Sequence, residues 1–176
     1  NVSESRSVGP NLSLIKSFVC VDGKDWQTSS VENSKDFSLA NLIKTRDSRF
    51  EASFYHKPTV KSKSCYLYPV KFIPRSALKY LEVKGGAPDV EYTSVNNLNG
   101  YPVLRYAEVL LNWIEAKAEL STLGAGSVTQ ADIDLSVNKI RNRPLAQEAV
   151  ERGVQKTAPM ELAALPDDPS RDSDVP

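Results

Sequence analysis

The stretch Tyr101 to Pro144, YPVLRYAEVLLNWIEAKAELSTLGAGSVTQADIDLSVNKIRNRP, decides the fold class of this 176-residue chain. In its first half, apolar side chains recur every three or four positions, which is the spacing of one face of an α-helix. They are Leu104, Ala107, Leu110, Leu111, Ile114 and Ala118. Alanine, leucine, glutamate and lysine dominate the segment, so helix propensity agrees with the pattern. The sequence therefore predicts a helix over Leu104–Ser121.

A second helix is predicted over Thr129–Asn142. Thr129 and Asp132 form a Thr-x-x-Asp variant of the capping box, which marks a helix start. Pro144 disfavours helical conformation at the residue before it, so the helix should end there. Two helices joined by a short glycine-containing loop make an antiparallel hairpin of the size of one tetratricopeptide-like unit.

A single hairpin of this kind cannot bury the apolar faces on both of its sides, whereas stacked repeats do so. The sequence holds no second copy of the unit. We therefore expect a mainly α fold that is a fragment of a larger α–α superhelix, a partial domain over residues 1–176. We also expect the Leu110 side of the first helix to face the second helix or missing neighbours, leaving an apolar patch.

Residues 11–100 are expected to be loop-rich with short strands, and residues 146–176 to form an irregular tail after the hairpin at 101–145. Asp-Gly at 22–23 favours a β-hairpin turn between 18–21 and 24–27. The remaining expected elements are a short helix at 36–44 capped by Asp36, a strand at 51–55, an extended segment at 66–73 and a weak helix at 146–152.

Composition excludes several classes of function. With 22 basic and 22 acidic residues the formal net charge is 0, which gives no electrostatic case for nucleic acid or an anionic membrane surface. No apolar run approaches the ~20 residues of a membrane-spanning helix. Cys20 and Cys65 fit no metal-ligand spacing, and two free thiols or one disulfide both remain open.

No constellation of residues suggests catalysis. Glu108 and Glu115 lie two helical turns apart, ~10.5 Å, which is not far from the ~6.5–9.5 Å between the carboxyl groups of inverting glycosidases. Arg105 is placed to pair with Glu108, and His56, the only histidine, has no recognisable triad partners. We expect no catalytic residue, no metal site and no cofactor.

Five segments, in order along the chain, resemble the SusD/RagB family of surface glycan-binding lipoproteins. They are NLSLIKSFVCVDGKDW at 11–26, TRDSRFEASFY at 45–55, LRYAEVLLNWIEAKAEL at 104–120, VNKIRNRP at 137–144 and DPSRDSDVP at 168–176. The resemblance implies a non-catalytic subunit that binds oligosaccharide and delivers it to a SusC-like TonB-dependent transporter. It also implies an outer-membrane, cell-surface location through a lipid anchor on an N-terminal part of the protein. The alternative is a tetratricopeptide-like protein-interaction scaffold that binds no glycan.

Within that interpretation, aromatic side chains are the candidates for sugar binding, because the C–H face of a pyranose stacks on an aromatic ring. Trp26 follows the Asp-Gly turn and is flanked by Asp25 and Gln27, which suits a stacking platform with polar neighbours. We therefore assign Trp26, Asp25 and Gln27 as the candidate glycan site. Ordinary packing of Trp26 in the core remains the alternative.

Overall fold

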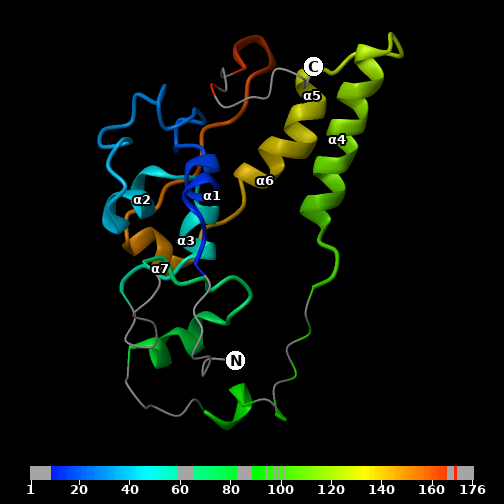
Figure 1. Ribbon diagram of the computed structural model, residues 1–176. Coiled ribbons are helices and arrows are strands. Elements are labelled where there is room, and N and C mark those ends of the chain that lie inside the picture. Colours follow the sequence, from blue (N-terminus) through cyan, green and yellow to red (C-terminus); the bar gives the residue numbers. More distant parts are fainter. Residues whose placement is uncertain are drawn as a thin grey trace.

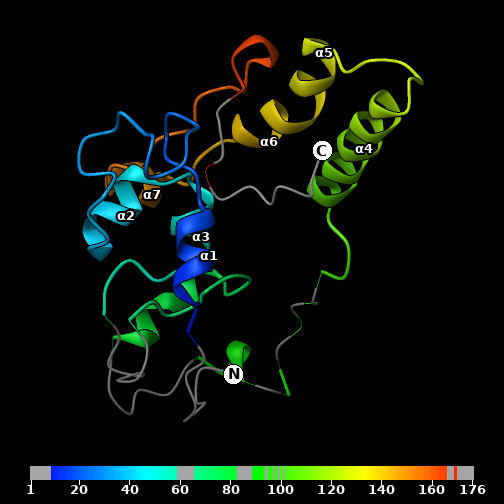
Figure 2. The same ribbon diagram turned by 45° about the horizontal axis from the view of Figure 1, so that its top comes forward.

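The computed structural model describes residues 9–58, 66–82, 89–93, 95–96, 98, 100, 102–165 and 169. These residues are mainly helical, which confirms the predicted fold class (Figure 1). Short helices α1 (Leu12–Ser17), α2 (Leu39–Thr45), α3 (Arg49–Ser53) and α7 (Gln147–Glu151) gather into one part. The long helix α4 (Tyr106–Thr122) stands beside this part, with α5 and α6 next to it (Figures 1 and 2).

The predicted helical hairpin is present. After α4 the chain turns and runs back through α5 (Gln130–Ile133), the π-helical turn η3 (Asp134–Asn138) and α6 (Lys139–Arg141). The first helix begins at Tyr106 rather than at the expected Leu104, because the backbone of Arg105 is extended, with φ −122° and ψ 147°. It ends before Gly124, whose φ of 78° suits glycine at a helix terminus.

Side-chain hydrogen bonds explain how the second helix begins and why it is interrupted. The capping box is confirmed: the Thr129 N–H donates to the Asp132 carboxylate at 2.8 Å, and the Thr129 hydroxyl accepts from the Asp132 N–H. Asp132 also pairs with Lys117 of α4 at 2.6 Å, which joins the two helices. Ser136 is buried and its hydroxyl donates to the Asp132 carbonyl at 2.6 Å, a back-bond of the kind that distorts helices, at the π-helical turn.

The apolar residues of α4 lie on two sides of the helix. Leu110 is buried, and α4 packs against η3 of the returning arm. A second apolar stripe stays exposed at the spacing of one helix face; it comprises Tyr106 (59% exposed), Val109 (45%), Trp113 (39%) and Leu120 (49%). The Leu110 side therefore faces the second helix as expected, and the exposed apolar patch lies on a different stripe of α4 from the one that the sequence indicated.

The main core lies among α2, α3 and α7. Buried Leu42, Ile43 and Phe50 pack with Phe54, and Phe18 contacts Phe50 edge-on with ring centroids 5.3 Å apart. The sequence placed a strand at Glu51–Tyr55, and this was wrong, since α3 occupies most of it. Asp47 decides the matter locally: its carboxylate accepts the Arg49 N–H at 2.9 Å at the helix start, and Phe50 and Phe54 then fall on one helical face.

The β-hairpin predicted at Asp22-Gly23 is formed only at its turn and in one flanking hydrogen bond, from the Cys20 N–H to the Lys24 carbonyl at 2.8 Å. Gly23 has φ 80° and its N–H donates to the Cys20 carbonyl at 2.8 Å, so the tight turn is formed. The strand partner is different: Val21 donates to Thr45 at 2.9 Å and Asp47 donates to Val19 at 2.8 Å. Cys20 accordingly forms an isolated bridge with Arg46, because the segment at 45–47 satisfies the backbone groups of Val19 and Val21 that a longer hairpin would have used.

The remaining elements are short. The helix expected at 36–44 is α2, whose N-cap is Ser38; Asp36 accepts the Ser38 N–H at 2.7 Å instead of capping the helix. The extended segment expected at 66–73 contributes one bridge, between Phe54 and Pro69. The weak helix at 146–152 is confirmed as α7. The 3₁₀ helices are η1 (Arg75–Leu81), η2 (Val90–Tyr92) and η4 (Leu162–Ala164).

Candidate functional site

The loop that carries the candidate glycan residues is held by Asp22. Its carboxylate accepts hydrogen bonds from the Lys24 N–H at 3.2 Å, the Ser30 N–H at 3.0 Å and the Ser29 hydroxyl at 3.0 Å. Burial opposes the charged form, but these hydrogen bonds lower the pKa of Asp22 below its ordinary value. An ionised Asp22 therefore fixes both ends of the loop from 22 to 30.

Trp26 is half-buried in this loop. Its ring packs edge-on with Phe37 at a centroid distance of 5.1 Å and an interplanar angle of 77°. The Lys16 ammonium lies over the Trp26 ring, 5.1 Å from its centroid. The side chain thus has a fixed orientation, with part of its surface in contact with protein and part facing solvent.

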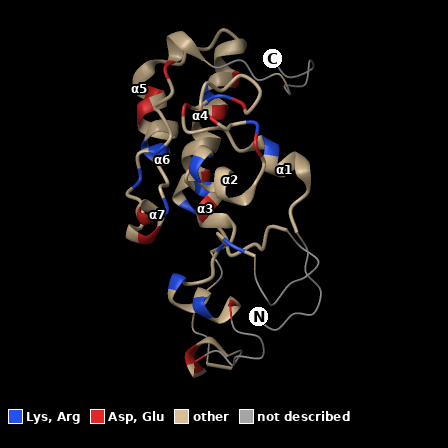
Figure 3. Ribbon diagram, turned by 90° about the vertical axis from the view of Figure 1, so that its left-hand side faces the viewer, with Lys and Arg blue, Asp and Glu red and all other residues tan. Residues whose placement is uncertain are grey.

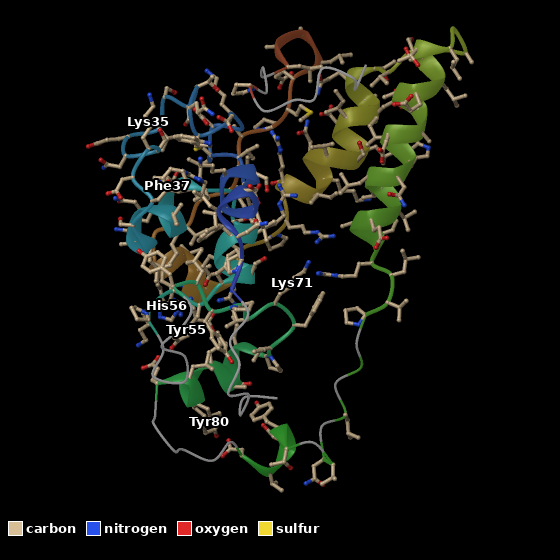
Figure 4. All side chains as sticks on the ribbon, in the orientation of Figure 1. Lys35, Phe37, Tyr55, His56, Lys71 and Tyr80 are labelled. Atoms are coloured by element: carbon tan, nitrogen blue, oxygen red, sulfur yellow. The ribbon has the colours of Figure 1, made fainter. Side chains whose placement is uncertain are left out.

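A buried arginine supports the aromatic pair. The Arg46 guanidinium lies 5.2 Å from the Phe37 ring centroid and is fully buried. It donates to the Ser34 carbonyl at 2.8 Å, to Thr45 Oγ1 at 3.0 Å and to Cys20 Sγ at 3.3 Å. Trp26, Phe37 and Arg46 therefore contact one another in sequence, from the half-buried indole to the buried guanidinium. Figure 4 places Phe37 beside α2.

The structure brings the three predicted site residues together at one turn. The Asp25 carboxylate accepts the Gln27 N–H at 2.8 Å, so Asp25 shapes the turn. Gln27 is exposed. Sequence reasoning missed Phe37, whose contact with Trp26 spans eleven residues and follows no local pattern.

The Arg-Asp-x-Arg-Phe segment is structural. Asp47 is buried and accepts a bond from Arg49 Nε at 2.6 Å and another from the Thr157 hydroxyl. Glu51, also buried, accepts both terminal nitrogens of Arg75, at 2.8 and 2.7 Å, and Arg152 Nη1 at 2.7 Å. Basic and acidic residues accordingly lie close together on the ribbon around α3 in Figure 3. These bonds tie α3 to η1 and to the end of α7.

Arg141 of the second helix is structural as well. It is buried, and its Nη1 donates to the Ala158 carbonyl at 2.8 Å. A Cβ on Gly23 would lie 3.0 Å from the same nitrogen, so the Asp-Gly turn and α6 approach closely here. The Ala158 N–H in turn donates to the Val21 carbonyl at 2.7 Å, so Ala158 links α6 to the segment just before the Trp26 loop.

A broad cleft of about 960 Å³ opens between the core helices and the N-terminal end of α4. Its walls come from α1, α3, the loop at Lys71 and Phe72, the segment that leads into α4, and the residues that follow α6. Sequence reasoning missed this cleft, because its walls meet only after the chain has folded.

Arg105 makes a different contact from the one that the sequence indicated, and His56 lies beside a tyrosine. No salt bridge joins Arg105 to Glu108 among the residues described here; Arg105 lies instead 5.7 Å from the Phe72 ring centroid. The cause is the extended backbone of Arg105, which places it outside the first helical turn. The His56 ring packs against the Tyr55 ring, with their centroids 4.7 Å apart (Figure 4). Burial lowers the pKa of the His56 imidazole. In the described part of the chain, no three His, Cys, Asp or Glu side chains cluster as a metal site would require.

Cys20 is a buried free thiol. Cys65, and with it the alternative of a disulfide between the two cysteines, lies outside the described residues. Of the helices that the structure describes, none combines the length and the apolar character needed to cross a bilayer.

These features define a class: a helical scaffold with a tetratricopeptide-like hairpin, whose most distinctive charged residues are buried in structural hydrogen bonds. A family model described as the SusD family matches residues 1–157. The chain therefore belongs to the SusD family, whose members are in general non-catalytic glycan-binding proteins of nutrient uptake at the outer-membrane surface. Four of the five resembling segments lie within the match, and 168–176 lies beyond it. Neither the curated proteins nor the solved structures gave a significant match.

Proposed function

We propose that this chain is part of a non-catalytic protein that binds oligosaccharide at the cell surface and delivers it to a SusC-like TonB-dependent transporter. The observation that carries the proposal is the family match over residues 1–157. In this proposal the outer membrane is reached through a lipid anchor on the protein, and no cofactor takes part.

The proposed sugar contact is Trp26, with Asp25 and Gln27 bonding hydroxyl groups. A half-buried indole can stack on the C–H face of a pyranose with the surface that Lys16 and Phe37 leave uncovered. Because Phe37 packs against the indole and Arg46 lies over Phe37, little side-chain freedom is lost when a sugar binds. Asp25 lies in the same turn, and Gln27 is exposed beside it.

Affinity electrophoresis of the whole chain against a panel of polysaccharides tests this proposal. Loss of an aromatic platform costs about 1–3 kcal/mol, so Trp26→Ala should weaken binding by roughly 5- to 150-fold. Trp113→Ala is the matched control, because the chain has two tryptophans and the second is exposed on α4. Equal binding by the parent and by Trp26→Ala would remove Trp26 from the site.

The non-catalytic part of the proposal is tested separately. Pure protein incubated with any oligosaccharide that it binds should release no shorter product over a day. Turnover that disappears in Glu115→Gln would contradict the proposal, since Glu108 and Glu115 are the carboxylates that sequence spacing brings closest to a glycosidase pair.

The alternative function, a protein-interaction scaffold without glycan binding, is favoured by one observation: the exposed apolar stripe of α4. The two functions differ in the polysaccharide panel. The scaffold predicts no retardation of the parent chain in any gel, whereas the proposed function predicts retardation in at least one.

A further inference from the structure

The cleft at the N-terminal end of α4 is lined by more basic than acidic residues. Three of the basic residues that line it, Lys71, Arg105 and Arg143, are exposed and form no salt bridge with any residue that the structure describes. They come from three separate segments of the chain. Figure 4 shows Lys71 on the side of the core that faces the segment leading into α4.

Of the other charged groups that line the cleft, two arginines are paired with carboxylates, and one further carboxylate has no salt bridge to a described residue. Arg49 pairs with Asp47 at 2.6 Å, and Arg75 pairs with Glu51 at 2.7 Å. Glu108 is the one acidic residue of the lining without a salt bridge to a described residue. Three cations therefore face one carboxylate, and in a concave site such an excess attracts anions.

An aromatic ring lies among the cations. Phe72 is 44% exposed, and its ring centroid lies 5.2 Å from Lys71 Nζ and 5.7 Å from Arg105 Cζ. Its φ of 72° is in the left-handed region, where a bulky residue is an outlier. Such outliers concentrate at ligand sites, and here Phe72 lines the cleft together with Pro102 and Arg105.

The remaining lining suits a sugar. Asn112 of α4 offers an amide, Ser48 and Ser53 at the two ends of α3 offer hydroxyl groups, and Leu145 and Ala146 provide apolar surface. A sugar needs these together: hydroxyl partners, a ring to stack on and apolar contact. The added cations distinguish this cleft from the Trp26 loop, where Lys16 lies over the ring.

We propose that this cleft is a second glycan subsite that recognises anionic sugars, with Phe72 stacking on the ring and Lys71, Arg105 and Arg143 bonding a carboxylate or sulfate group. The inference rests on the proposed glycan-binding function and adds a charge class to it. Carboxylate and sulfate share the chemistry that these cations recognise, namely a compact anionic group with several acceptor oxygens.

The test is titration calorimetry of the whole chain with three probes: a galacturonate oligosaccharide, its fully methyl-esterified form, and a sulfated oligosaccharide of similar length. The ester has the same backbone without the charge. The proposal predicts tighter binding of an anionic probe than of the ester. It also predicts weakening as salt rises from 0.02 to 0.5 M, because the screening length falls from about 20 Å to about 4 Å over roughly that range.

Variants then locate the binding. Arg105→Gln and Arg143→Gln should each weaken binding of the anionic probe by about fivefold, the upper end for an exposed ion pair. Phe72→Leu should weaken the anionic probe and the ester alike. The matched control is Lys35→Gln, an exposed lysine that Figure 4 places on the far side of the core from Lys71, and it should change nothing.

The outcomes separate the two proposals. Galacturonate and its ester binding equally, with the sulfated probe no tighter, overturns the anionic subsite and leaves glycan binding standing. Anion binding that Lys35→Gln weakens as much as Arg105→Gln does overturns the location. Binding of none of the three probes overturns the subsite, while retardation on neutral polysaccharides would still support the proposed function. A preference for either anionic probe that Arg105→Gln reduces supports the inference and says which anion the cleft accepts.

Discussion

Replacing Glu51 with glutamine should be among the most damaging single changes to stability. The Glu51 carboxylate is buried and accepts three hydrogen bonds of 2.7–2.8 Å from Arg75 and Arg152, two of them in a bidentate pair. Glutamine keeps the shape but removes the charge and leaves two guanidinium groups facing one amide. Removing one partner of a buried ion pair typically costs about 3–5 kcal/mol.

The partners' exposure refines this magnitude. The Arg75 and Arg152 side chains are 32% and 27% exposed, so water can solvate them when the carboxylate is gone. We therefore expect the lower end, about 3 kcal/mol, measured by urea denaturation. For a chain of this size each kcal/mol lowers Tm by about 2–4 °C, which gives a fall of about 6–12 °C.

The pH dependence provides an independent check. Burial opposes ionisation of Glu51, but hydrogen bonds from Arg75 and the charges of Arg75 and Arg152 lower its pKa below the ordinary 4.5. A lowered pKa contributes stability that is complete above pH 4.5 and is lost as pH falls toward the folded-state pKa. The difference between parent and Glu51→Gln should therefore be constant near pH 7 and shrink in acid. Glu115→Gln, at an exposed site, is the control. A loss no greater than that of this control would refute the reasoning.

Three further substitutions and probes follow from the packing. Phe50→Ala should cost about 3–5 kcal/mol in urea denaturation, because the ring is fully buried against two others; a loss below 1 kcal/mol would contradict the core. Gly23→Ala should lower Tm more than Gly124→Ala: both have positive φ, costing about 1–2 kcal/mol, but only at Gly23 would the added carbon meet Arg141, at 3.0 Å. Cys20 should resist a thiol reagent at pH 8 until the chain is unfolded, because burial raises the pKa of its thiol. A labelled Cys20 peptide, found by mass spectrometry after the folded protein is treated with the reagent, would contradict this.

Elements with local causes were predictable from the sequence. The capping box of Thr129 and Asp132, and the apolar spacing of 104–121, lie within single helices, so their geometry follows from neighbours three or four residues away. The same holds for the short helix expected at 36–44, where Leu39, Leu42 and Ile43 of α2 are all buried. The strand at 51–55 failed because alternation over five residues is weaker than the hydrogen bonds of Asp47 and the packing of Phe50 on Phe54.

The candidate site divides in the same way. The sequence by itself determined the family, the helical hairpin and the placing of Trp26 with Asp25 and Gln27 on one turn. Only the tertiary structure decided that Arg46 and Glu51 are buried supports rather than surface groups, and that Phe72 meets Arg105. The reason is physical: a capping bond or an apolar stripe is encoded by short spacing, whereas burial of a charge and the formation of a cleft depend on segments brought together from 30 to 100 residues apart.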